Sequence, residues 1–355
     1  MTVVTSTNGL KLRLIRIRDV QRGFSETYYS GKYPVEYVVH PGDLLVGMDG
    51  EFNISRWKDR DALLNQRVCK ITAKNGTSEE YIRFALSKAL KEIEQRTSFV
   101  TVKHLSAKEL NRLVLDIPCY SSQVHIVGLC SSLERIIEKR KKQLQILDEL
   151  IKARFVEMFG DPEINTKGYQ KEPLQKHADV LVGYPFKSEG YTEGGVRIVG
   201  GYNLMQGFII WEDCKYWPDT DGFEQYLLKD GDIVMAMDRP WVNGGFKIAS
   251  VDKEHLPALL IQRTACIRGK DVEQEFLYSL LNSHWFADHC NITGSLVPHI
   301  SNKDINSYEI VLPPIEEQKA YAEFVRQVDK SKSVVKKSLD ETQLLFDSLM
   351  QKYFG

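Results

Sequence analysis

Two segments of the chain combine arginine, tryptophan and asparagine directly after a predicted strand. Met237–Gly245 contains Arg239, Trp241 and Asn243 beside a glycine pair, and Met48–Arg60 has the same residue types after the corresponding strand. Such side chains, in loops or at strand edges, contact phosphate groups and base edges. The two segments are therefore candidate nucleic-acid contacts, although a solvated loop with one packed tryptophan explains them equally well. The candidates in the first segment are Asn53, Arg56, Trp57, Lys58 and Arg60.

Five more residues outside these segments have side chains suited to the same chemistry. Lys187, Tyr202 and Asn203 lie near the start of the second half of the chain and are further candidate contacts. Arg16 and Arg18 alternate along a predicted strand, where a solvent-facing strand with salt bridges explains them equally well.

Two short patterns recur at matching positions and favour structural roles. Gln66-Arg67 and Gln262-Arg263 each open a predicted strand, and a buried structural arginine explains the recurrence better than a surface contact. His104 and His299 each precede a Ser-x-Lys-Asp/Glu turn, where a capping role is favoured over a catalytic one.

Motifs for catalysis, for metal binding and for membrane insertion are missing from the sequence. No Asn/Asp-Pro-Pro-Tyr/Phe is present to methylate a flipped adenine, and no glycine-rich loop ends in Lys-Ser/Thr to bind ATP. The six cysteines are scattered without a CxxC pair, which favours reduced thiols in a cytoplasmic protein and no metal site. No apolar run approaches the length of a membrane span. We therefore expect a chain that is not itself an enzyme and does not bind a membrane.

The balance of charge limits how this chain can contact nucleic acid. It has 47 basic and 48 acidic residues among 355. Any nucleic-acid surface must therefore arise from local segregation of charge rather than from a basic protein as a whole.

The elements that would position these residues are present in two copies. His104–Leu110 matches His299–Ile305 at an offset of 195 residues, and Gly42–Asp49 matches Gly231–Asp238 at an offset of 189. The matched segments keep their order over more than 100 residues, so the chain is an internal duplication. Each copy reads as an α+β domain of short strands and one helical region. The predicted pairs are Leu12–Val20 with Val196–Leu204, Leu44–Met48 with Ile233–Met237, Gln66–Thr72 with Gln262–Arg268, and a helix ending near Gln95 with Val272–Cys290.

Each copy ends in a long helix with a narrow apolar seam. Heptad spacing over Ser122–Phe159 and over about Glu316 to Phe354 predicts two long helices, each of which needs a partner helix to cover its seam and finds it in the other. The offset grows from 195 to 199 along these helices, which predicts a difference of about one turn between them. Arg140 and Arg154 are polar seam positions that would help to fix the pairing register, and Lys332 also lies on the seam. The other seam positions are Ile126, Cys130, Leu133, Ile137, Leu144, Leu147, Ile151 and Met158 in the first helix, and Val325, Val328, Val335, Leu339, Thr342, Phe346, Leu349 and Tyr353 in the second.

The two copies begin differently. The second copy has about 36 residues before its first matched strand, including Leu174–Phe186, whereas the first has about a dozen. We expect the first domain either to lack this opening segment or to receive it from elsewhere. The predicted division is 1–119 and 160–314 for the two domains, with 120–159 and 315–355 for the helices.

This layout resembles the DNA-specificity subunit of type I restriction–modification systems. The resemblance covers essentially the whole chain and is carried by the duplication, the two helices, Val182–Ser188, and Leu312–Gln318, which opens the second helix. It implies a non-catalytic protein whose two target-recognition domains each contact one half of a split, asymmetric site in double-stranded DNA. It also implies that the two long helices pack as an antiparallel coiled coil, which spaces the domains and binds two adenine-methyltransferase subunits. ATP-driven restriction/translocase subunits would be further partners. S-adenosylmethionine, ATP and Mg²⁺ would be bound by those partners and not by this chain.

Two other interpretations remain open from the residues alone. A coiled-coil scaffold that binds only protein would need the same two helices but no DNA contacts. A nuclease with an undetected active site would cut DNA in the presence of Mg²⁺ alone.

Overall fold

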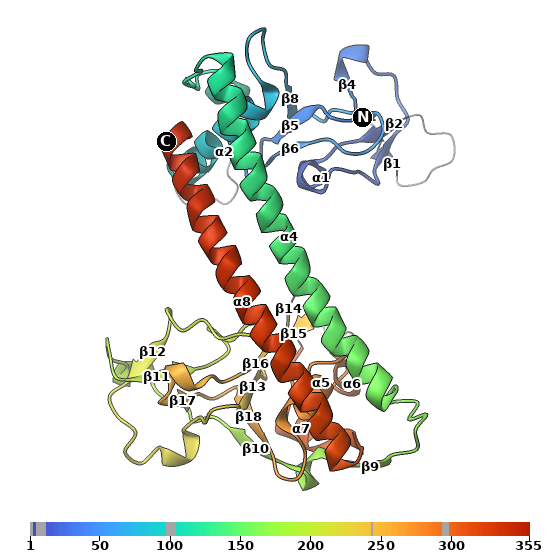
Figure 1. Ribbon diagram of the computed structural model, residues 1–355, viewed down its shortest axis with the longest axis vertical. Coiled ribbons are helices and arrows are strands. Elements are labelled where there is room, and N and C mark those ends of the chain that lie inside the picture. Colours follow the sequence, from blue (N-terminus) through green and yellow to red (C-terminus); the bar gives the residue numbers. More distant parts are fainter. Residues whose placement is uncertain (1–2, 5–11, 97–103, 243, 293–297) are drawn as a thin grey trace. The chain divides into compact units, whose positions relative to one another are not determined.

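The computed structural model describes residues 3–4, 12–96, 104–242, 244–292 and 298–355, and it divides into two compact units. The first unit comprises Met1–Lys142 with Val335–Gly355, and the second comprises Gln143–Val334. Each unit thus contains one globular domain and half of each long helix (α4 green, α8 red in Figure 1). The sequence-based division treated each helix as a separate segment, whereas the contacts assign each half-helix to a domain.

The first unit has two small sheets, ordered β1-β3-β2-β7-β4 and β6-β5-β8. The central strand β5 is buried along its length, which explains its apolar sequence. The elements of this unit are β1 (Val3–Val4), β2 (Leu12–Leu14), α1 (Ile17–Arg22), β3 (Tyr28–Tyr29), η1 (Val35–Tyr37), β4 (Val38–Val39), β5 (Leu44–Gly47), β6 (Ile54–Arg56), β7 (Ala62–Leu63), β8 (Val68–Ile71), α2 (Glu79–Arg96), α3 (Ala107–Leu110) and the start of α4 (Tyr120–Phe159).

The second unit repeats the central strands of both sheets, with one strand more than the β6-β5-β8 sheet and two fewer than the other sheet among the described residues. Its sheets have the orders β10-β18-β13-β16 and β12-β11-β17, beside the pairs β14-β15 and β19-β9. Its elements are β9 (Gln170–Pro173), η2 (Leu174–Lys176), β10 (Ala178–Val182), η3 (Ser188–Gly190), β11 (Val196–Val199), β12 (Lys215–Trp217), η4 (Glu224–Tyr226), β13 (Ile233–Ala236), β14 (Trp241–Val242), β15 (Gly245–Phe246), β16 (Ile248–Ser250), η5 (Lys253–His255), β17 (Ala258–Leu260), β18 (Thr264–Gly269), α5 (Gln274–Leu281), α6 (His284–His289), α7 (Asn302–Ser307), β19 (Glu309–Leu312) and the start of α8 (Ile315–Phe354).

The strand pairing confirms the duplication. β2 runs parallel to β7 with Leu14 opposite Leu63, and β11 runs parallel to β17 with Ile198 opposite Leu259. β5 and β13 are each antiparallel to the strand that follows the Gln-Arg pair, β8 and β18 respectively. Both copies are α+β domains, as the sequence predicts.

The opening segment of the second copy forms β9 and β10, and β10 pairs with β18 along its whole length. Among the strands that the structure describes, β8 of the first unit pairs only with β5. Because the two copies begin differently, the sheet around β13 has four strands, whereas the corresponding sheet around β5 has three among the described residues.

The two Gly-Asp motifs form the same turn before the central strand of each domain. Gly42 and Gly231 have φ values of +96° and +81°, a left-handed conformation that glycine adopts without strain. The Asp43 carboxylate accepts a hydrogen bond from the His40 amide at 2.8 Å, and that of Asp232 accepts one from the Lys229 amide at 2.7 Å. The turns thereby direct β5 and β13 into the cores.

A buried glutamine joins each long helix to its own domain. The Gln123 side chain accepts a hydrogen bond from the Ser78 amide at 2.8 Å and donates one to the Pro118 carbonyl at 2.8 Å. The Gln318 side chain makes the same two contacts with the Glu273 amide, at 3.0 Å, and the Pro313 carbonyl, at 2.8 Å. The duplicated motif thus fixes the start of each helix.

Every predicted heptad position of α4 and α8 is buried or half-buried, as side chains on a paired seam should be. In the second unit, Asp148 forms an ion pair with Lys332 at 2.7 Å, and the Arg154 guanidinium lies over the Phe324 ring. Residue numbers rise along α4 as they fall along α8, so the helices are antiparallel. In the first unit, Ile126 and Cys130 of α4 share a core cluster with Phe346 and Met350 of α8.

Four sequence-based expectations about elements are wrong. The strand predicted over Leu12–Val20 ends at Leu14, and α1 follows, because the Asp19 carboxylate accepts the Arg16 amide at 2.9 Å and Gly23 ends the helix at φ +78°. The strand predicted over Val196–Leu204 ends at Val199, before a turn. The helix predicted over Val272–Cys290 is divided into α5 and α6, since Ser283 caps α6. The long helices do not differ by a turn, because each has 40 residues.

Candidate nucleic-acid interface

The candidate segment of the second domain is a β-hairpin. β14 pairs with β15, placing Trp241 opposite Phe246, and the two rings meet edge to face with centroids 4.7 Å apart. Trp241 is therefore half-buried against the core, which limits its availability for stacking on a base. Arg239 precedes the hairpin and is exposed, whereas Asn243 lies outside the described residues.

Two hollows lie on the surface beside this hairpin and share residues Ile261 and Gln262. One, of about 440 Å³, is lined by Gly201, Tyr202, Asp238, Arg239, Lys247, Ile261, Gln262 and Arg263. The other, of about 700 Å³, is lined by Pro185, Phe186, Lys187, Ser188, Glu189, Tyr191, Lys215, Ile261 and Gln262. Because the hollows share two residues, they form one continuous surface, which we call the cationic groove. It contains Lys187, Lys215, Arg239, Lys247 and Arg263 against the two acids Glu189 and Asp238.

Two lysines of the cationic groove are held in place, Lys215 by aromatic rings and Lys247 by a backbone carbonyl. The Lys215 ammonium lies 4.9 Å from the centre of the Tyr191 ring and 5.0 Å from that of Tyr202. The Tyr202 hydroxyl donates a hydrogen bond to the Ile198 carbonyl at 2.8 Å, which fixes the ring. Lys247 donates to the Gly201 carbonyl, and partial burial lowers the pKa of its ammonium. The Tyr202 ring is therefore partly exposed and also holds the Lys215 ammonium in place.

Asn203, predicted as a contact, is fully buried. Its side-chain oxygen accepts the Gly200 amide at 2.9 Å, and its amide nitrogen lies 3.1 Å from the Cys214 sulfur. This asparagine shapes the turn that ends β11 and does not present a polar group to a ligand.

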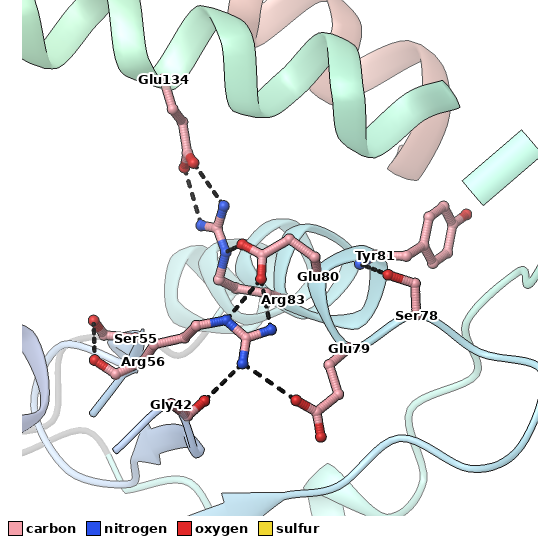
Figure 2. A network of polar contacts seen from close by, with 9 residues as sticks. All are labelled: Gly42, Ser55, Arg56, Ser78, Glu79, Glu80, Tyr81, Arg83 and Glu134. Atoms are coloured by element: carbon pink, nitrogen blue, oxygen red, sulfur yellow. Dashed lines mark hydrogen bonds and ion pairs between the residues drawn. The ribbon is translucent and has the colours of Figure 1, made fainter. Parts of the chain in front are cut away.

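In the first domain, two of the predicted contacts serve the fold instead. The Arg56 guanidinium donates to the Glu80 carboxylate at 2.8 Å, to that of Glu79 at 3.2 Å and to the Gly42 carbonyl at 2.6 Å (Figure 2). Trp57 is fully buried, and its indole nitrogen donates to the Arg60 carbonyl at 2.8 Å. The packed-tryptophan interpretation therefore holds for this segment.

The remaining candidates of the first domain differ in exposure. Lys58 and Arg60 are exposed, and Asn53 is half-buried. The Lys58 stem lies against Gly23, where a side chain on that residue would meet it at 3.0 Å. Lys58 and Arg60 are thus the cations of this segment that a ligand can reach.

The recurring Gln-Arg pairs are exposed in both domains, so the expectation of a buried structural arginine is wrong. The Arg263 side chain is 73% exposed and forms an ion pair with Asp238 at 2.9 Å. His299 does not cap a helix, because its Nδ1 lies 2.6 Å from the same Asp238 carboxylate. The cap of α7 is Ser301, whose hydroxyl accepts the Asp304 amide.

Sequence reasoning missed Lys215 and Lys247 and assigned Gln262 and Arg263 to the fold. For Gln262 and Arg263, the recurrence of Gln-Arg at matching positions was a usable signal, because only the exposure of the pair was predicted wrongly. Lys215 and Lys247 carried no such signal, because their positions depend on how β12 and β16 bring distant segments together.

A family model described as the type I restriction modification DNA specificity domain matches residues 12–147 and 168–342. The chain belongs to this family. The resemblance predicted from the sequence is therefore confirmed, and the two matched ranges correspond to the two copies of the duplication.

Relatives within the family agree over different lengths. The MjaVIII specificity subunit of Methanocaldococcus jannaschii is 24% identical over 327 residues, which cover 87% of this chain and 77% of that protein. The EcoAI specificity subunit of Escherichia coli is 32% identical over 232 residues, covering 62% of this chain and 39% of that protein. A crystal structure of the S subunit from M. genitalium has a TM-score of 0.58 at 14% identity, covering 99% of this chain and 90% of that one, and it supports the fold.

Within the part of the chain that the structure describes, none of the helices combines the length and the apolar character that crossing a bilayer needs.

Proposed function

We propose that this chain is the specificity subunit of a type I restriction–modification complex and that it reads a split, asymmetric target in double-stranded DNA. Each globular domain would contact one half of the target. Family membership and the duplication support this proposal, and the cationic groove of the second domain is the observation that carries it. Local segregation of positive charge is what a chain with a net charge of −1 needs in order to bind phosphate.

The proposed contacts divide into two groups. Lys187, Lys215, Arg239 and Arg263, which line the groove, would bind phosphate groups, and Gln262 would present its amide donor and acceptor to a base edge. Tyr202 supports Lys215. In the first domain, Lys58 and Arg60 remain the proposed contacts from its candidate segment.

Methylation and cleavage belong, in this proposal, to partner subunits. Two adenine-methyltransferase subunits would bind S-adenosylmethionine, and restriction/translocase subunits would bind ATP and Mg²⁺. Apolar side chains exposed on the long helices support docking of such partners, because exposed Leu and Ile residues on a helix favour contact with another protein. These side chains are Leu129, Ile136, Ile146 and Leu150 of α4 and Val334, Leu344 and Leu345 of α8.

The direct test is the methylation motif of a host that carries this chain with its partners. Sequencing that detects N6-methyladenine should reveal a split motif with two different halves, and the motif should disappear when the gene for this chain is deleted. A host whose methylation is unchanged by the deletion would contradict the proposal.

A second test separates this function from that of a coiled-coil scaffold. Replacing Lys215 and Arg239 by alanine should weaken DNA binding of the assembled complex and reduce its dependence on salt concentration, by roughly 0.9 in the logarithmic slope for each lost phosphate contact. A scaffold that binds only protein would leave DNA affinity unchanged. Assembly with the partner subunits, measured by size-exclusion chromatography, should be unaffected in either case.

A further inference from the structure

The same aspartate–arginine–histidine cluster is present in both domains, and we call it the Asp-Arg-His trio. In the second domain, Asp238 contacts Arg263 at 2.9 Å and His299 at 2.6 Å through its two carboxylate oxygens. In the first domain, Asp49 contacts Arg67 at 3.4 Å and also His104, through the same two oxygens respectively. The duplication thus preserves a set of side-chain contacts in addition to a fold.

The trio re-forms although the chain between its members differs in length. Asp49 and Arg67 are 18 residues apart, whereas Asp238 and Arg263 are 25 apart. The inserted residues belong to the hairpin and strands between them. Both contacts of the aspartate are therefore present in spite of the divergence of the intervening segment, and in the first domain the Arg67 guanidinium also lies 3.0 Å from His104 Nδ1.

Stability does not account for this retention. Backbone hydrogen bonds already join the three segments in both domains: the Met48 amide donates to the Arg67 carbonyl, and the Met237 amide to that of Arg263. The Leu105 and Ile300 amides donate in turn to the carbonyls of those two methionines. The side chains add exposed ion pairs, since Arg263 and His299 are 73% and 55% exposed, and such pairs contribute about 0–1 kcal/mol.

The surroundings of the second trio indicate an anionic ligand. Asp238 and Arg263 line the same hollow as Arg239 and Lys247, so three cations surround one acid. Arg239 and Arg263 have φ values of +46° and +63°, a left-handed conformation that side chains other than glycine adopt at a cost. Strained backbone of this kind is typical of binding sites, where it directs a side chain toward a ligand.

We propose that Asp49 and Asp238 are positioning residues, each of which orients an arginine and a histidine to bind one backbone phosphate of double-stranded DNA. The inference rests on the proposed function and specifies it, because it gives both domains one shared, sequence-independent contact at the same place. A phosphate contact fixes the orientation of a domain on the duplex and carries no base preference. The loops that differ between the domains are then left to read different bases.

The test uses the full chain assembled with its methyltransferase subunits and two DNA duplexes, one with the methylated motif and one without it. Arg263→Gln and Arg67→Gln should each weaken binding to both duplexes several-fold and reduce the logarithmic salt slope by roughly 0.9. Arg263→Lys retains the charge and should restore the slope while recovering only part of the affinity, because lysine lacks the planar fork that Asp238 orients. The motif that is methylated should not change.

A positioning role for Asp238 and a purely electrostatic role predict opposite changes in DNA affinity when the aspartate is replaced. Asp238→Ala removes a negative charge, so an acid that only offsets its neighbours would yield tighter DNA binding when replaced. A positioning aspartate yields weaker binding, since Arg263 and His299 lose the carboxylate that aligns them. Tighter binding of the Asp238→Ala complex would overturn the proposal.

An exposed ion pair at the far end of β18 supplies matched controls. Lys270 contacts Asp179 at 2.9 Å, and both side chains are exposed. Lys270→Gln and Asp179→Ala should leave affinity and salt slope near those of the unmodified complex. If Arg263→Gln and Arg67→Gln behave like Lys270→Gln, the trio binds no phosphate. If the unmodified complex itself binds neither duplex, the proposed function fails as well.

Discussion

Arg83 of α2 shows how single residues hold the first unit together. Its guanidinium contacts the Glu134 carboxylate of α4 through two nitrogens, at 3.0 and 2.6 Å, and that of Glu80 at 2.5 Å (Figure 2). Arg56 contacts Glu80 from the other side. Burial by itself would raise the pKa of Glu80, but the two arginines outweigh it and lower the pKa. The arginines of this network are thus structural, in contrast to the exposed arginines of the trios.

Replacing Arg83 should destabilise the first unit in a pH-dependent way. Because the pKa of Glu80 is lowered on folding, its contribution to stability is present above the unfolded value of about 4.3 and is lost as pH falls through the folded value. Arg83→Met should therefore lower the free energy of unfolding by about 2 kcal/mol at pH 7, and by less at an acidic pH where Glu80 is protonated in the folded state. Hydrogen exchange of α2 peptides, measured at both pH values, checks this.

An equal loss of stability at both pH values would contradict this prediction. It would mean that Arg83 acts through packing on the Phe84 ring, whose centre lies 4.0 Å from the guanidinium carbon, rather than through the carboxylates. Arg326→Met is a matched control, since Arg326 also pairs with two glutamates but is exposed.

At the scale of elements, the long helices were predictable and the short strands were not. A heptad seam repeats over 40 residues, so Leu144 and Leu339 could be placed on it from spacing alone. Strand β2 has only three residues, and the alternation that predicted a longer strand continued through α1, where the Asp19 contact and Gly23 decide the outcome. Such local contacts have no periodic signature.

The candidate site was predictable only where the duplication helped. Matching segments identified the loops of Arg239 and Lys58, yet residue type could not show that Trp57 and Asn203 are buried. Burial depends on tertiary packing, because the same tryptophan in a loop can face either way. Only the structure could distinguish the structural role of Arg56 from the accessible position of Arg263, because the difference depends on which acids lie near each guanidinium.

The duplicated glutamines provide a prediction at this scale. Gln318→Leu would leave the Glu273 amide and the Pro313 carbonyl without their partner in a buried site. We expect a loss of about 2 kcal/mol in the stability of the second unit, and a similar loss in the first unit for Gln123→Leu. Urea unfolding followed by hydrogen exchange assigns each loss to its unit.

A control on the same helix tests the reasoning. Gln327 is exposed, and its side-chain amide donates to the Glu323 carboxylate one turn away at 3.2 Å, so Gln327→Leu should change stability by less than about 0.5 kcal/mol. Equal effects at Gln318 and Gln327 would show that the buried hydrogen bonds contribute little.

At the scale of the whole molecule, the two units repeat one packing scheme. In the first, Tyr81 of α2 packs on Phe354 at the end of α8, with ring centroids 5.1 Å apart. In the second, Phe276 of α5 packs edge to face on Phe159 at the end of α4, at 4.9 Å. Each domain therefore packs against the start of its own long helix and the end of the other. A chain built from one copy twice should consequently satisfy the same contacts.

This repetition leads to a prediction about the target. A chain in which residues 160–355 occur twice in tandem would have two identical domains, and the end of α8 would supply Phe354 where α4 supplies Phe159. Two identical readers contact identical half-sites, whereas the native chain should recognise two different halves. With its partner subunits, the tandem chain should methylate a split motif that contains one native half twice. A motif with unequal halves from a folded and assembled tandem complex would show that the domains do not read DNA as equivalent units.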